Sequence, residues 1–149
     1  MSSTHLVTNI DELAALVPDG AIVAMPGDRR GVSMAIVKAL IRRSVQGLHL
    51  INVPTGNIET DMLIGAGCIE ELTTSGISLG EYGRAPNFCK AVIEKKIRIN
   101  ESSCPAIHSA LQASEKGVPF MPIRGILGSD VLKNRHDWKV IDNPMQPGE

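Results

Sequence analysis

The stretch AIVAM at residues 21–25 decides the fold of this chain. It is apolar at every position and lies between turn residues, which is typical of a strand buried on both faces of a parallel sheet. After a loop at 26–31, residues 33–44 place apolar side chains at helical spacing and end in two arginines. A second apolar strand is predicted at 48–53, so the chain alternates strand and helix from its start.

The same alternation extends in both directions. Further helices are predicted at about 9–17, 60–66, 86–96 and 104–116, and further strands at 68–74, 97–99, 118–123 and 138–141. Caps are expected from Thr8 and Ser103 at helix starts and from Gly47 and Gly117 at helix ends. This pattern predicts an α/β fold with an open, mostly parallel sheet and flanking helices, whose ligands bind at the carboxyl ends of the strands.

Composition excludes several classes of function. The 149 residues, 43% of them hydrophobic, fit one domain over 1–149. A formal net charge of -1 and only 3% aromatic residues argue against nucleic acid as a partner. No apolar run is long enough for a membrane span, and the polar start has no signal-peptide core, so we expect a cytoplasmic protein. Three widely spaced cysteines fit reduced thiols, and no metal site is expected.

The first loop with chemical interest follows the strand at 21–25. Gly27, Asp28 and Arg29 bring backbone amides and a guanidinium to a helix N-terminus, a combination that suits a phosphate or carboxylate. The loop has neither the Lys-Ser/Thr ending of a P-loop nor the three glycines of a dinucleotide motif. The alternative is a solvated turn in which Asp28 pairs with an arginine.

The second loop of interest joins the strand at 97–99 to the helix at 104–116. Glu101, Ser103 and Cys104 bring a carboxylate, a hydroxyl and a thiol to one strand end. A buried glutamate can act as base or nucleophile, and a thiol at a helix N-terminus can be activated, with His108 one turn further on. The alternatives are a capping or ion-paired acid, an inert thiol and a surface histidine. A third loop, at 78–83, is either a mobile cover over a site or an ordinary surface loop.

Short motifs in a fixed order give the chain a family resemblance. They include Pro18-Asp19-Gly20-Ala21-Ile22-Val23, Leu63-Ile64-Gly65-Ala66-Gly67-Cys68, Asn100-Glu101-Ser102-Ser103, Gly117-Val118-Pro119-Phe120 and Gly128-Ser129-Asp130. In this order the chain resembles the A (α) subunits of family I CoA-transferases, and the glutaconate CoA-transferase branch most of all. The resemblance implies a CoA-transferase-like α/β domain shortened at its C-terminus, because the α subunits of the family continue well beyond residue 144.

The resemblance also implies a reaction and a partner. Family members transfer CoA through a glutamyl thioester at the junction with a homologous B-type subunit, which usually supplies the glutamate. A related branch opens steroid ring remnants as CoA-ester hydrolases, and there the functional glutamate of the α subunit aligns with Glu101. Where the family has a Gly-Gly-Phe or Gly-Phe loop, this chain has Gly27, Asp28 and Arg29, and Cys104 replaces an amide or imidazole side chain.

We therefore predict a CoA-transferase subunit that acts on a small acyl-CoA and a carboxylic acid, with a B-type subunit or a second copy as partner. Glu101 is the predicted acid, base or nucleophile, Gly27, Asp28 and Arg29 would contact the acyl or CoA portion, and Ser103 and Cys104 would line the thioester site. Coenzyme A enters as a thioester substrate, with no permanently bound cofactor. The alternatives are a ring-opening hydrolase subunit, a non-catalytic acyl-CoA or partner-binding relative, and thiol chemistry at Cys104 and His108.

Overall fold

A four-stranded parallel sheet forms the centre of the protein. The computed structural model describes residues 6–27, 31–146 and 148. Its strands are β1 (Ile22–Pro26), β2 (Leu48–Val53), β3 (Ile69–Thr74) and β4 (Arg98–Glu101), paired in chain order. The predicted α/β fold with an open parallel sheet is confirmed. All four strands end at the same edge of the sheet, where the predicted loops lie.

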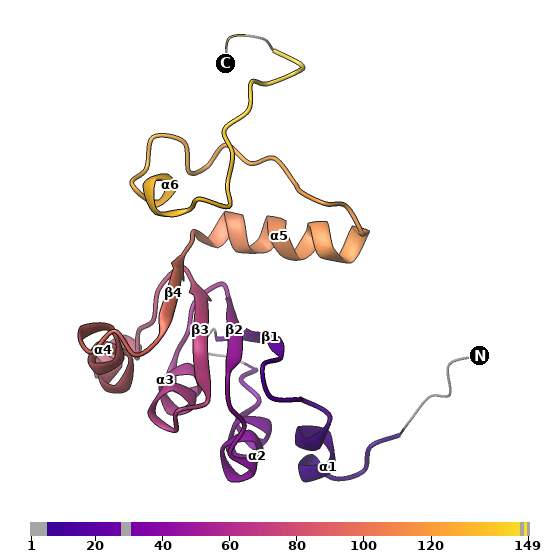
Figure 1. Ribbon diagram of the computed structural model, residues 1–149, viewed down its shortest axis with the longest axis vertical. Helices are drawn as coiled ribbons and strands as arrows, with labels where there is room; N and C mark the ends of the chain where they lie inside the picture. Colours follow the sequence, from indigo (N-terminus) through magenta and orange to yellow (C-terminus); the bar gives the residue numbers. More distant parts are fainter. Residues whose placement is uncertain (1–5, 28–30, 147, 149) are drawn as a thin grey trace.

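The helices form two groups around this sheet. They are α1 (Ile10–Ala15), α2 (Met34–Arg43), α3 (Ile58–Gly65), α4 (Pro86–Ile93), α5 (Cys104–Lys116) and α6 (Val131–Asn134), with a 3-10 turn η1 (Gly80–Tyr82) before α4. Helices α1 to α4 pack on one another in chain order and occupy the lower part of the view in Figure 1. Helix α5 crosses above the sheet, and the chain after α5 lies beyond it. Right-handed connections between strands in sequential order place α2, α3 and α4 on one face of the sheet.

The hydrophobic core lies between the sheet and these helices. Leu48 and Leu50 of β2 and Leu72 of β3 are fully buried, as are Leu40 of α2 and Leu63 of α3. Along β2, buried and half-buried side chains alternate, because successive side chains of a strand point to opposite faces. One face of the sheet therefore belongs to the core.

The prediction that the strand at 21–25 is buried on both faces is wrong. Within the described part of the chain, β1 is an edge strand that pairs with β2, and Ile22 is 70% exposed. Ile22 pairs with His49, which lies on the half-buried face of β2. An apolar run makes a strand compatible with burial on both faces. Whether both faces are covered depends on the strands beside it and on the elements that pack on the sheet.

Caps explain most differences in element boundaries. Asn9, rather than Thr8, caps α1 by accepting hydrogen bonds from the amides of Asp11 and Glu12. Helix α2 ends at Ser44 in the left-handed conformation, ahead of the predicted Gly47, and Asn57 starts α3 two residues earlier than predicted. Two predicted caps of α5 are confirmed. Ser103 caps its start, and Gly117, with a φ of +66°, ends it.

Three other predicted segments differ. The predicted helix at 86–96 ends at Ile93, and the predicted strand at 97–99 extends to Glu101 as β4. Within the described residues, the predicted strands at 118–123 and 138–141 have no strand pairing, and a short helix, α6, lies between them. Pro119 and Pro122 have no amide hydrogen to donate to a ladder, which disfavours the first of these strands.

Candidate functional site

A cavity of about 290 Å³ lies at the carboxyl edge of the sheet. Its lining residues come from the loops after β1, β2 and β3: Gly27, Thr55, Gly56, Asn57, Gly76, Ile77, Ser78 and Gly80. This is the place where open parallel sheets bind their ligands. Half of the lining residues are glycines, so backbone atoms form much of the wall.

Two of these glycines are required by close packing. A Cβ on Gly27 would lie 1.9 Å from the carbonyl oxygen of Thr55 and 2.7 Å from Oε1 of Glu59, so a larger residue would push the loops after β1 and β2 apart. A Cβ on Gly56 would lie 2.6 Å from Oδ1 of Asn52 and 2.8 Å from the Thr60 hydroxyl, so a larger residue would displace these buried side chains. The wall therefore depends on glycine at both positions.

A buried polar layer lies beneath this wall. Asn52, Glu59 and Thr60 are each 0% exposed. The Asn52 amide donates to the Thr60 hydroxyl at 2.7 Å, and Glu59 Oε1 accepts from the Thr60 hydroxyl and from the backbone amide of Asn57 at 2.8 Å. Among the described residues, Asn52 Oδ1 and Glu59 Oε2 have no hydrogen-bond partner. Buried acceptors are rarely left unpaired, so this layer has the capacity to bind one or more further donors.

Most backbone amides of the wall are already used within the loops. Gly56 donates to the Gly76 carbonyl, Asn57 to Glu59, and Ser78 to the Gly56 carbonyl. Gly80 donates to the Ser78 hydroxyl at 3.0 Å, an arrangement in which that hydroxyl can still donate its own proton. The hydroxyls of Thr55 and Ser78 and the amide group of Asn57 are therefore the side-chain donors that the wall offers to a ligand.

The residues at the end of β4 lie beside the cavity. Glu101 pairs with Thr74 in the sheet, its side chain is exposed, and its backbone carbonyl accepts from Arg135 at 3.0 Å. Ser102 donates its amide to the Thr74 carbonyl. The Ser103 hydroxyl accepts from the Ala106 amide at 3.3 Å, so it serves as the cap of α5.

Cys104 connects this strand end to the cavity. Its Sγ lies 3.3 Å from the hydroxyl of Ser75, which in turn donates to the Pro54 carbonyl at 2.8 Å. Ser75 precedes Gly76 of the cavity wall. Both Cys104 and His108 are described and exposed, and no hydrogen bond joins them, so the geometry does not form the Cys-His pair weighed from the sequence.

A second cysteine, Cys68, lies in the core. Cys68 is 1% exposed, and burial raises the pKa of its thiol. A raised pKa leaves little of the reactive thiolate near neutral pH. Cys68 is therefore a packing residue, whereas Cys104 is the exposed thiol near the cavity.

The structure brings together some of the predicted site residues. Gly27 lines the cavity, and Cys104 contacts Ser75, the residue before Gly76 of the wall, whereas Glu101 and Ser103 are not among the lining residues. Asp28 and Arg29 lie outside the described residues. The loop at 78–83, predicted as a cover or a surface loop, contributes Ser78 and Gly80 to the lining.

Sequence reasoning missed the buried layer and the role of Arg135. Asn52 interrupts an apolar strand, and a polar residue in the buried phase of a strand is a signal that the sequence does carry. Glu59 and Thr60 sit in the first turn of a short helix, where acidic and hydroxyl residues are common for other reasons. Arg135 is distant in sequence from Glu101 and carries no local signal.

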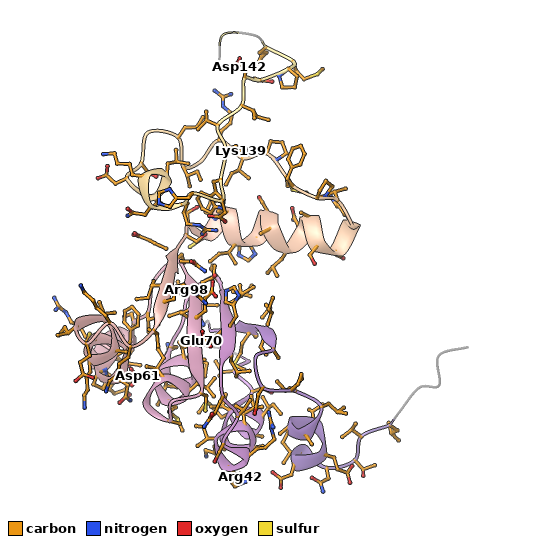
Figure 2. All side chains as sticks on the ribbon, in the orientation of Figure 1. Arg42, Asp61, Glu70, Arg98, Lys139 and Asp142 are labelled. Carbon is orange, nitrogen blue, oxygen red and sulfur yellow. The ribbon has the colours of Figure 1, made fainter. Side chains whose placement is uncertain are left out.

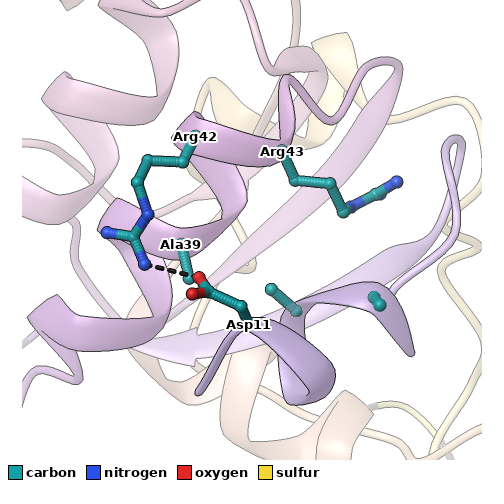
Figure 3. A pocket seen from close by; sticks show the side chains of 6 residues that line it. Asp11, Ala39, Arg42 and Arg43 are labelled. Atoms are coloured by element: carbon teal, nitrogen blue, oxygen red, sulfur yellow. Dashed lines mark hydrogen bonds and ion pairs between the residues drawn. The ribbon is translucent and has the colours of Figure 1, made fainter. Parts of the chain in front are cut away.

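A second cavity, of about 280 Å³, lies between α1 and α2 and far from the strand ends. Figure 3 shows its lining, in which the exposed carboxylate of Asp11 accepts a hydrogen bond from Arg42. The remaining lining residues are three alanines and Arg43. Such a set offers one exposed ion pair and no group suited to acyl chemistry.

Two searches of the described residues complete this inventory. In residues 6–27, 31–146 and 148, no three His, Cys, Asp or Glu side chains are grouped to hold a metal ion. The same part of the chain contains no helix with the length and apolar character needed to cross a bilayer.

Comparison with known proteins gives this fold and site a family. The chain is 30% identical over 144 residues to the A-type subunit of 3-oxoadipate CoA-transferase from Pseudomonas knackmussii, and the match covers 95% of this chain and 51% of the relative. It is 29% identical over 127 residues to the cholesterol ring-cleaving hydrolase IpdA subunit of Rhodococcus jostii, covering 84% of this chain and 42% of that relative. No protein-family model matches the chain.

The solved structure of glutaconate coenzyme A-transferase from Acidaminococcus fermentans shares the fold. Its TM-score is 0.81 at 21% identity, with 95% of this chain and 50% of that chain covered. The fold is thus the α/β fold of the CoA-transferases. Sequence similarity and fold together make this a family I CoA-transferase A-subunit-like protein, which spans about half the length of the relatives it matches.

Proposed function

We propose that this chain acts as an A-type component of a CoA-transferase that moves CoA between a small acyl-CoA and a carboxylic acid. The observation that carries the proposal is the cavity at the carboxyl edge of the sheet, walled by glycines and polar side chains and flanked by Glu101. Homology to the A-type subunit of 3-oxoadipate CoA-transferase along 95% of the chain supports this chemistry. A B-type subunit is the proposed partner.

The cavity suits the charge changes of CoA transfer. When a carboxylate attacks a thioester carbonyl, the carbonyl oxygen gains negative charge, and the C–S bond then breaks to release the CoA thiolate. Hydroxyl and amide donors near that oxygen lower the barrier. Thr55, Asn57 and Ser78 are the proposed donors, and the Gly27 backbone, which lines the cavity, is the proposed contact for the acyl portion.

Glu101 is the proposed acid, base or nucleophile of this chain. It is the last residue of β4, and its side chain reaches solvent at the edge where the cavity opens. Cys104 and Ser103 are proposed to border the thioester, Cys104 through its contact with Ser75. The proposed contacts of Asp28 and Arg29 with the acyl or CoA portion follow from the loop sequence alone.

A second candidate function is hydrolysis of a ring-containing CoA ester. The observation that favours it is the 29% identity to the cholesterol ring-cleaving hydrolase IpdA subunit. In this case Glu101 would activate water or move a proton, and no CoA would pass to a second acid. The two functions use the same residues and differ in their products.

The test compares Glu101→Gln with Glu115→Gln, a matched loss of one exposed carboxylate at the far end of α5. Both proteins, with the polypeptides that co-purify with them, are given a panel of acyl-CoA esters with and without acetate, and new CoA esters and free CoA are measured. We expect Glu101→Gln to lower turnover by a factor of about 100 or more and Glu115→Gln to leave it within about twofold.

The products separate the alternatives. A new CoA ester that requires acetate supports the transferase, and a ring-opened CoA ester formed without acetate and without release of CoA supports the hydrolase. Borohydride treatment followed by intact-mass measurement locates a glutamyl thioester on this chain or on its partner. Unchanged turnover in Glu101→Gln would refute its role, and binding of acyl-CoA without any turnover would leave the non-catalytic relative as the answer.

A further inference from the structure

The chain after α5 returns to the end of β4 and brings one arginine to Glu101. Helix α6 contacts β4, and Arg135 follows α6 directly. The Arg135 side chain is 11% exposed, against 64% for Arg98 and 57% for Arg42. An enclosed guanidinium is costly unless its donors are paired, so its contacts define its role.

Three groups hold the Arg135 guanidinium. Its Nη1 donates to the backbone carbonyl of Glu101 at 3.0 Å. Its Nε and Nη2 donate to the two carboxylate oxygens of Asp137 at 2.8 and 2.7 Å, and its carbon lies 4.0 Å from the centre of the Trp138 ring. Hydrogen bonding from Arg135 lowers the pKa of Asp137, so this carboxylate stays charged at neutral pH. The Arg135 cluster, meaning Arg135, Asp137 and Trp138, is thus joined by hydrogen bonds and a ring contact and reaches Glu101 through Nη1.

The strand that carries Glu101 needs such support. Strand β4 has four residues, and among the residues that the structure describes it lies at the edge of the sheet with β3 as its neighbour. The end of a short edge strand opens easily when few contacts hold it. The Arg135 cluster supplies a hydrogen bond to the last carbonyl of this strand from a segment 34 residues further along the chain.

We propose that Arg135 is the positioning residue for Glu101: it fixes the backbone at the end of β4 and so sets where the Glu101 carboxylate lies relative to the cavity. The inference rests on the proposed function for the role of that carboxylate. Only an arginine can pair bidentately with Asp137, stack on Trp138 and reach Glu101 at once, because a lysine has one ammonium and no planar fork. A displacement of about 1 Å at a reacting group can cost about 100-fold in rate.

The first measurement is independent of activity. Amide hydrogen exchange is compared between the native chain, Arg135→Gln and the control Arg42→Gln, which removes an exposed guanidinium between α1 and α2. We expect Arg135→Gln to speed exchange of the Ser102 amide, which donates to the Thr74 carbonyl, at least about tenfold and to leave the Leu50 amide unchanged. Trp138, the single tryptophan of the chain, should shift its fluorescence emission to the red in the same variant. Unchanged exchange at Ser102 would overturn the inference.

The second measurement separates positioning from general stability. We expect Arg135→Gln to lower kcat by about 10- to 100-fold with little change in KM, Arg135→Lys to remain impaired, and Arg42→Gln to match the native chain. In a Glu101→Gln background, Arg135→Gln should cost nothing further, because the group that it positions is already gone. If Arg135→Gln fails to fold, Asp137→Asn is used in its place. We expect it to speed amide exchange and to lower kcat in the same way, by smaller factors.

Failure of this inference differs from failure of the proposed function. If Glu101→Gln abolishes turnover while Arg135→Gln and Arg135→Lys keep the native kcat, the proposed function stands and the positioning role is wrong. If Glu101→Gln leaves turnover unchanged, the role of Glu101 is wrong, and the exchange measurement still decides whether Arg135 holds the end of β4.

Discussion

The two faces of the sheet differ although they share the same strands. On the face under the helices, Leu48, Leu50 and Asn52 of β2 are fully buried. On the other face, His49, Ile51 and Val53 of the same strand are half-buried. We call these the helix face and the open face. The difference comes from topology, because strands in sequential order with right-handed connections place their helices on one side.

The open face is polar where β3 and β4 meet. The His49 ring lies 2.8 Å from the Thr73 hydroxyl, and Glu71 accepts hydrogen bonds from Arg98 and Asn100. Figure 2 labels Arg98 on β4 and Glu70 on the neighbouring β3. A parallel sheet usually has both faces covered by other elements. On this half-exposed face, the hydrogen bonds instead pair the polar side chains with one another. The comparison teaches that burial in this protein follows the placement of helices more than the apolarity of the strand.

The largest expected effect compares neighbours on β2 that point to opposite faces. Leu50→Ala should lower the free energy of unfolding by about 2–5 kcal/mol, because it leaves a cavity in the core. Ile51→Ala should cost less than about 2 kcal/mol, because its side chain is already half-exposed. Urea unfolding of both variants measures the difference, and equal losses would contradict the assignment of the faces.

The second prediction concerns a polar group under the helix face. Asp61 is 5% exposed, and its carboxylate accepts from the Phe88 amide and the Asn87 side chain, both at 2.8 Å, at the start of α4. Asp61→Ala should lower the free energy of unfolding by about 1–3 kcal/mol, since it leaves two half-buried donors at the start of α4 unpaired. The exposed Asp11 is the matched control, and a similar loss in Asp11→Ala would argue against this explanation.

The third prediction tests the open face through pH. The hydrogen bond from Asn100 holds the pKa of Glu71 below its ordinary value, with His49 and Arg98 adding to this effect. Because the pKa is lower in the folded state than in the unfolded chain, the ionised Glu71 stabilises the fold at pH values above the ordinary Glu pKa of about 4.3. This contribution is lost as the pH falls through the lowered pKa of the folded state. Glu71→Gln should therefore flatten the acid limb of stability, measured by urea unfolding from neutral to acid pH, by less than about 1 kcal/mol. An unchanged acid limb would show that Glu71 does not contribute.

The smallest effect is expected far from both faces. Asp11 and Arg42 form an ion pair between α1 and α2, with side chains 64% and 57% exposed (Figure 3). Arg42→Ala should change the free energy of unfolding by less than about 1 kcal/mol, and the difference should shrink in high salt. A loss as large as that of Asp61→Ala would mean that this contact matters more than its exposure suggests.

The sequence predicted local elements well where local rules decide them. Strand β2 and helix α5 have the predicted bounds, because an apolar run between turn residues and a helix between Ser103 and Gly117 are defined within their own segments. The segments at 118–123 and 138–141 have apolar residues but, among the described residues, no strand neighbours, so the same pattern misled there. Trp138, for example, stacks on Arg135 instead of joining a sheet.

The candidate site divides in the same way. The sequence placed Gly27 and Glu101 at strand ends, and parallel strands bring those ends to one edge. It could not show that the amides of the cavity wall are used within their own loops, or that Asn52 and Glu59 lie together beneath it. Those contacts join residues on different elements, and no local pattern encodes them.

The sequence by itself therefore determined the alternation of strands and helices, the capping of α5 and the position of polar residues after the strands. These features depend on backbone geometry and on side chains a few residues apart. Only the tertiary structure decided which face of the sheet is buried, which glycines close the cavity wall, and that Arg135 holds the end of β4. Each of those depends on distances between segments that are far apart in the chain, and such distances are fixed by packing alone.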